Sequence, residues 1–197
     1  MTDLTAPAHE VAPLLLGCLL RQDGVVVRLT EVEAYAGQDD PAAHAVGGPR
    51  PRTRHLFAEA GTLYCYLSHG LHICGNLVCG VPGHGSAVLL RAGEVVEGLD
   101  EARSRRPGVA DVALARGPGN FGRVMGWTLA HSGGRLGSGG LELLPPVEPV
   151  PASRVASGPR VGVSVAYERP WRFWITGDPT VSAYRRSPRA VPGIRPW

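Results

Sequence analysis

The chain has 197 residues, of which 44% are hydrophobic and 19% are charged, and its formal net charge at pH 7 is +3. This composition predicts one folded domain with a substantial core and excludes a disordered chain, while 27 glycines and 18 prolines exclude a coiled coil. All 20 basic residues are arginine, which excludes a catalytic lysine amine and a lysine Schiff base.

In chain order, the hydrophobic pattern predicts a helix over 9–21, strands over 25–35, 62–68, 71–79 and 86–92, helices over 96–106 and 117–127, and strands over 141–144, 160–166 and 171–176. His69 and Gly70 are expected to form the tight turn between the second and third strands. We predict a single domain over 1–197, with its core at about 10–183 and a tail over 184–197, rich in arginine and proline, that we expect to be mobile.

The chain carries no pattern typical of export or of a membrane span. Its first ten residues lack a positive segment. Residues 60–90 carry no formal charge, but six glycines, Pro82 and three histidines interrupt them, which favours buried strands over a span. The four cysteines lack C-x-x-C spacing. We therefore expect reduced thiols in a cytoplasmic protein without a membrane partner.

The first candidate site combines Glu33, Tyr35 and His44. Glu31, Glu33 and Tyr35 share one face of the strand over 25–35, because side chains alternate along a strand. A histidine from the following loop could join a carboxylate and an aromatic ring there, which are the groups of a base beside a stacking platform. The alternative is a charged residue and a tyrosine on a solvent-exposed face.

Two further motifs each allow a functional and a structural interpretation. His69, His72, Cys74 and Cys79 are four possible zinc ligands, but their spacing is not that of a zinc finger, and buried cysteines in a core strand are the alternative. The sequence GPGNFG over 117–122 has the G-x-G-x-x-G spacing of a dinucleotide-binding motif. That motif also needs a second strand after its helix, and no strand pattern follows at the right distance. A glycine turn before a helix that touches a phosphate is the favoured interpretation.

Basic side chains gather in two other places. Arg50, Arg52 and Arg54 flank prolines between the two candidate pocket strands, where they would either contact phosphate or lie in a solvated loop. Further candidates for phosphate contact, all in the tail, are Arg185, Arg186 and Arg189.

Six segments in one order resemble the alkyladenine DNA glycosylase family, the 3-methyladenine DNA glycosylases of the vertebrate and bacterial type. They are EVEAYAGQDDPAAH at 31–44, PRTRHLF at 51–57, GTLYCYLSHGLHICGN at 61–76, AVLLRA at 87–92, RGPGNF at 116–121 and PRVGVS at 159–164. The resemblance implies a mixed α/β (α+β) fold, in which a curved, mainly antiparallel sheet carries the pocket and helices pack around it. It also implies excision of alkylated or deaminated purines from duplex DNA without a cofactor or metal.

The resemblance also assigns roles to residues of this sequence. Glu33 matches the carboxylate that activates water, and Arg91 matches its partner. Residues that match the pocket for the flipped base are Tyr35, His44, Tyr66 and Asn76. Apart from the resemblance, the glycine turn at Gly117 and Gly119 is expected to contact a DNA phosphate.

The sequence departs from the family pattern at two positions. His69 stands where the animal enzymes have the tyrosine that fills the gap left by the flipped nucleotide, so we expect His69 to intercalate with help from Leu71. Asn120 stands where the family often has lysine. Neither change touches the residues assigned to the chemistry.

The sequence thus predicts a monofunctional glycosylase that hydrolyses the bond to 3-methyladenine, 7-methylguanine, hypoxanthine or ethenoadenine and leaves the DNA strand intact. Its partner would be duplex DNA containing a damaged purine, and it would act as a monomer. The alternatives are a non-catalytic reader of damaged DNA and a zinc enzyme.

Overall fold

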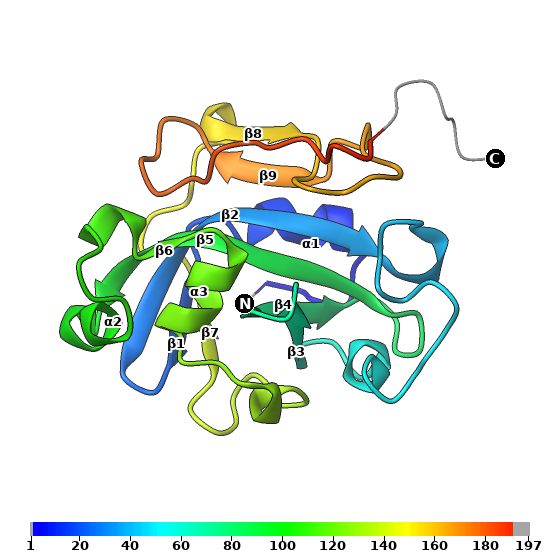
Figure 1. Ribbon diagram of the computed structural model, residues 1–197, viewed down its shortest axis with the longest axis horizontal. Helices are drawn as coiled ribbons and strands as arrows, with labels where there is room; N and C mark the ends of the chain where they lie inside the picture. The colour runs from blue at the N-terminus through cyan, green and yellow to red at the C-terminus, as the bar shows by residue number, and fades with distance from the viewer. Residues whose placement is uncertain (1, 191–197) are drawn as a thin grey trace.

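The computed structural model describes residues 2–190 and shows one nine-stranded antiparallel sheet with three α-helices (Figure 1). The elements are α1 (Ala8–Leu14), β1 (Leu19–Gln22), β2 (Val25–Ala36), β3 (Leu63–Ser68), β4 (His72–Cys79), β5 (Ser86–Glu97), α2 (Leu99–Arg105), β6 (Ala115–Arg116), α3 (Pro118–Val124), β7 (Glu142–Leu144), β8 (Val155–Gly158) and β9 (Arg172–Ile175). The predicted mixed α/β class is confirmed. No helix among the described residues is long and apolar enough to cross a membrane.

The two longest strands, β2 and β5, form the centre of the sheet. Along its outer edge β2 pairs first with β1 and then with β9, while β5 pairs with β4 and β6 on its own outer edge. In Figure 1, β8 and β9 lie above β2, and α3 crosses in front of the sheet. The main core packs the apolar faces of α1, α3 and the sheet together, and a smaller apolar cluster joins the loop over 43–56 to β3, β4 and β5.

Two predicted boundaries and one predicted strand are wrong. The helix predicted over 9–21 ends at Leu14, because Gly17 takes a φ of 83° and the chain turns back as β1. The helix predicted over 96–106 begins only at Leu99, since β5 continues to Glu97 and Gly98 turns the chain with a φ of 72°. Residues 160–166 form no strand; the Val161 N–H donates to the Glu33 carboxylate, and the Arg160 side chain donates to the Ala34 carbonyl.

The hairpin of β3 and β4 is confirmed, and its turn is tight. Both central residues have positive φ, 50° at His69 and 70° at Gly70, and the Leu71 N–H donates to the Ser68 carbonyl at 3.0 Å. This is the pattern of a type I′ turn, whose twist matches that of the two strands. The turn places His69 at the tip of the hairpin.

The helix α3 packs unusually close to β4 through Gly122, the third glycine of the GPGNFG motif. A Cβ atom at Gly122 would lie 2.0 Å from the backbone oxygen of Ile73. We expect Gly122→Ala to lower the free energy of unfolding by about 1–3 kcal/mol in urea denaturation, because the helix must move off the strand. The exposed Arg123→Ala on the same helix is the control, with a change within about 0.5 kcal/mol. Equal effects of both variants would contradict the close-packing explanation.

Candidate active site

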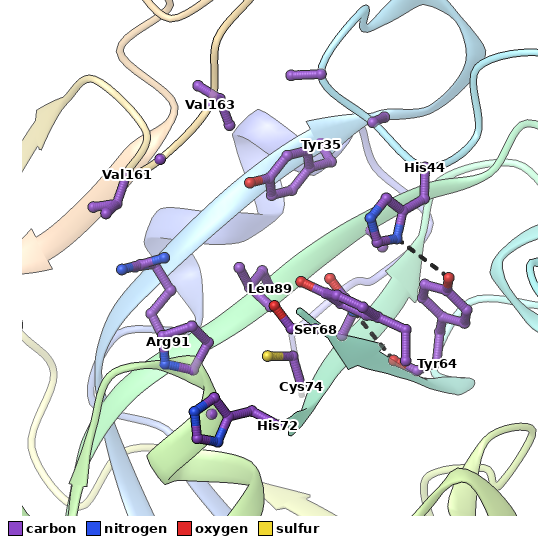
Figure 2. Close-up of a pocket in the computed structure, with 18 of the residues that line it drawn as sticks. Tyr35, His44, Tyr64, Ser68, His72, Cys74, Leu89, Arg91, Val161 and Val163 are labelled. Carbon is purple, nitrogen blue, oxygen red and sulfur yellow. Dashed lines mark hydrogen bonds between the residues drawn. The ribbon is translucent and has the colours of Figure 1, made fainter. Parts of the chain in front are cut away.

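A pocket of about 680 Å³ opens between four parts of the fold. One wall comes from the β3–β4 hairpin and β5, a second from residues 117–120 at the start of α3, a third from residues 41–44, and a fourth from residues 161–165. Figure 2 shows Tyr35 and His44 on one side of the pocket and Arg91 and His72 on the other. The volume lies within the range of small-molecule sites in proteins.

Aromatic rings cover much of the pocket wall. Tyr64 and Tyr66 project from the same face of β3, with ring centroids 5.8 Å apart and nearly parallel planes. The His44 ring meets Tyr66 edge-on at 4.4 Å, and its Nδ1 lies 3.3 Å from the Tyr64 hydroxyl. Tyr35 faces the pocket from β2, while the buried guanidinium of Arg160, which does not line the pocket, stacks 4.6 Å from its ring centroid. These surfaces suit a flat ligand that stacks.

Glu33 lies behind this aromatic wall with its side chain fully buried. The Tyr35 hydroxyl donates to Oε2 at 2.9 Å, the Val161 N–H donates to Oε1 at 2.7 Å, and Arg91 Nη1 lies 3.4 Å from Oε1. Two hydrogen bonds and one ion pair, from three segments, therefore fix the orientation of the carboxylate. The structure thus brings together Glu33, Tyr35 and Arg91, as the sequence predicts, and adds Val161.

A β-bulge aims Arg91 at two carboxylates. Leu90 pairs with Val32 and Ala92 pairs with Glu31, so Arg91 has no partner on β2. Its Nε donates to Glu31 Oε1 at 2.8 Å, and the two nearby carboxylates raise the pKa of the guanidinium although burial alone would lower it.

Glu31 is a positioning residue to which the sequence alone assigns no role. It also accepts hydrogen bonds from Arg172 Nε and from the Ser182 N–H, both at 2.7 Å. Burial alone would raise its pKa, but Arg91 and Arg172 and these hydrogen bonds lower it below the ordinary value. Its place on the same strand face as Glu33 was visible in the sequence, whereas its partners 141 and 151 residues away were not.

A buried ion pair between Asp40 and Arg160 connects the segments that frame the pocket, and sequence reasoning missed it. Arg160 donates through Nη1 and Nη2 to the two oxygens of Asp40, and both side chains are fully buried. Asp40 also accepts from the backbone N–H groups of Ala36 and Ala42. Because Val161 follows Arg160 directly, the pair holds the N–H that reaches Glu33.

Some of the other predicted site residues line the pocket and some do not. Asn76 lines the pocket and donates from Nδ2 to the Tyr64 carbonyl at 3.2 Å. Leu71 is 77% exposed at the hairpin tip, and further residues that line the pocket are His69, Gly117 and Gly119. Arg50, Arg52 and Arg54 do not line it.

The glycines of the GPGNFG motif have structural reasons in this fold. Gly117 turns the chain into α3 with a φ of 94°, and a Cβ at Gly119 would lie 2.7 Å from Cβ of His72. The preceding strand β6 pairs antiparallel with β5, so the parallel βαβ unit of a dinucleotide fold is absent from the described residues.

Cys74 and Cys79, two of the four possible zinc ligands, are buried in different parts of the fold. Cys74 lines the pocket, whereas Cys79 lies in the main core beside Ser86, and burial raises the pKa of the Cys79 thiol to about 11. Within residues 2–190, no three His, Cys, Asp or Glu side chains are grouped to hold a metal ion.

His44 is expected to stay neutral near pH 7. Burial lowers its pKa below 6.5, and the charge of Arg52 lowers it further. We expect Arg52→Gln to raise the pKa of His44 towards 6.5, as measured by NMR titration of its ring protons, with burial keeping part of the shift. Arg54→Gln is the matched control, because Arg54 acts on His55 instead. A pKa of His44 that is the same in both variants would rule out the effect of Arg52.

Comparisons with known proteins identify the family of the chain. The family model described as methylpurine-DNA glycosylase matches residues 2–179. Two proteins printed as "Putative 3-methyladenine DNA glycosylase" are similar over nearly their whole length. The one from Cutibacterium acnes is 52% identical, covering 94% of this chain and 100% of its own, and the one from Nocardia farcinica is 50% identical, covering 95% and 92%. On these matches, the chain belongs to the methylpurine-DNA glycosylase family.

Proposed function

We propose that this protein is a monofunctional DNA glycosylase that takes a damaged purine nucleotide out of duplex DNA into the pocket and hydrolyses its N-glycosidic bond. The observation that carries the proposal is the buried carboxylate of Glu33, held by two hydrogen bonds and an ion pair behind an aromatic pocket. A base inside a duplex cannot be reached, so it must be flipped out, which costs a few kcal/mol and least for a damaged base.

Different residues of the pocket and of the hairpin tip stack on the flipped base, exclude normal guanine and enter the duplex. Stacking on Tyr35 and Tyr66 stabilises the flipped base by about 1–3 kcal/mol for each ring. Asn76, fixed by its bond to the Tyr64 carbonyl, presents its amide where it would crowd the exocyclic amine of normal guanine. His69 and Leu71, at the tip of the hairpin, would enter the duplex where the nucleotide has left.

Hydrolysis needs a base for water and a negative charge near the sugar. As the bond to the purine breaks, positive charge builds on the sugar, which the Glu33 carboxylate stabilises while it takes a proton from the attacking water. Arg91, tied to Glu31, keeps that carboxylate in place. Without a lysine side chain, water is the nucleophile, and strand cleavage through a lysine Schiff base does not occur.

The test is an assay for abasic sites in duplexes that contain hypoxanthine, 3-methyladenine, 7-methylguanine or ethenoadenine, with DNA in excess over protein. Alkali-labile sites should form over several turnovers, and the strand should stay intact without alkali. Binding to these duplexes without any base release would instead support a non-catalytic reader of damaged DNA. Intact-strand analysis before alkali treatment separates hydrolysis from lyase activity.

A further inference from the structure

The C-terminal segment over 183–190, here named the arginine strap, carries three exposed arginines and no acidic residue. They are Arg185, Arg186 and Arg189, and none of them has a carboxylate partner among the described residues. Arg186 stacks on the Tyr167 ring with its guanidinium 4.8 Å from the centroid. An arginine without an acidic neighbour keeps its full positive charge available to an anionic partner.

The positive charge of the whole chain depends on this region. The sequence contains 20 basic and 17 acidic residues, and four of the basic ones lie within residues 184–197. Without those four the chain would carry one more acidic than basic residue. Affinity for DNA depends on how many phosphates the basic side chains neutralise, so a group of arginines without acidic neighbours is a place where the chain can gain it.

Hydrogen bonds place the strap beside the pocket. On its N-terminal side, the Ser182 N–H donates to Glu31. In its middle, the Arg185 carbonyl accepts from the Gly162 N–H at 3.0 Å, and Gly162 belongs to the wall over 161–165. Ser187 and Ala190 are buried. Figure 1 shows the strap, in red, running beside β9 and the orange segment that precedes β9.

We propose that the arginine strap binds phosphates of duplex DNA on the 161–165 side of the pocket mouth and supplies a large share of the salt-dependent affinity, without taking part in the chemistry. The inference rests on the proposed function. A duplex that delivers a nucleotide to the pocket lies across its mouth, so its backbone passes over both the hairpin tip at His69 and the opposite wall that the strap borders. Guanidinium groups suit phosphate oxygens at that wall.

The experiment compares the full-length wild-type protein with a triple variant, Arg185→Gln, Arg186→Gln and Arg189→Gln. Binding to a lesion-free 20-base-pair duplex is measured by fluorescence anisotropy between 50 and 200 mM NaCl. Each lost phosphate contact lowers the slope of log affinity against log salt by about 0.9, so three contacts lower it by about 2.7 and make the affinity change over this range about 40-fold smaller. Single-turnover base release at saturating protein and low salt should stay within twofold of wild type.

A second triple variant, Arg21→Gln, Arg103→Gln and Arg135→Gln, removes the same charge from residues that do not line the pocket. Its salt slope should match wild type. An unchanged slope in the strap variant, or an equal fall in both variants, would overturn the inference. The salt slope is measured on lesion-free DNA, so it does not depend on base release. If the protein is not a glycosylase, only the excision assay would show it.

Discussion

The Glu33→Gln protein is expected to release hypoxanthine from duplex DNA about 10³-fold more slowly than wild type under single-turnover conditions. The amide can no longer accept a proton from water or stabilise the charged sugar, and general-base contributions of this kind are about 10²–10⁴-fold. Glutamine keeps the size and one carbonyl acceptor, so the variant should still bind the lesion duplex with an affinity within about threefold of wild type.

The control for this prediction is Glu148→Gln, which removes one exposed carboxylate that does not line the pocket. It should release base at the wild-type rate. If Glu33→Gln retained full activity, the role of Glu33 as the base would be wrong, although the family membership of the chain would stand. Loss of binding together with loss of activity would point to a damaged pocket instead.

Asp40→Ala should lower the free energy of unfolding by about 3–5 kcal/mol, because the fully buried guanidinium of Arg160 would lose its counter-charge. Urea denaturation measures the change. Adding Arg160→Met to Asp40→Ala should restore part of the stability, since removing both charges leaves no unpaired ion. The double variant should nevertheless stay slow in base release, because it lacks the ion pair that positions the Val161 N–H on the Glu33 carboxylate.

An exposed pair of the same residue types provides the control. Asp100 lies 3.0 Å from Arg103 on α2, with its side chain 98% exposed. Asp100→Ala should change the stability by less than about 1 kcal/mol. If Asp40→Ala were no more destabilising than Asp100→Ala, the buried pair would not hold the pocket frame together.

Patterns of neighbouring residues predicted the parts of the site that lie on single strands. Alternation placed Glu33 and Tyr35 on one face of β2. The turn at His69 followed from the glycine beside it and from the apolar runs on both sides. These features depend on φ and on period-two alternation, which a short stretch of sequence determines.

The remainder depends on contacts between distant parts of the chain. Arg160 meets Asp40 across 120 residues, and Ser182 meets Glu31 across 151. Residues 160–166 alternate like a strand, but tertiary contacts hold them along the pocket instead. Gly17 ends the first helical region although the apolar pattern continues through it. In these places packing overrides local preference.

The bulge at Arg91 on β5 lies near a second bulge at Thr30 on β2. Together the two bulges determine which single-residue deletions the site tolerates. Thr30 is the extra residue on β2, just as Arg91 is on β5, so the pairing of the two strands shifts by one residue and then returns. Deleting either residue alone would leave the shift uncorrected, and a slip of one residue turns alternate side chains to the opposite face of a sheet. Single-residue deletions here should therefore exchange core and pocket residues, whereas deleting both together would keep the strands in phase and would remove Arg91 together with Thr30, whose hydroxyl lies 2.7 Å from that of Thr180.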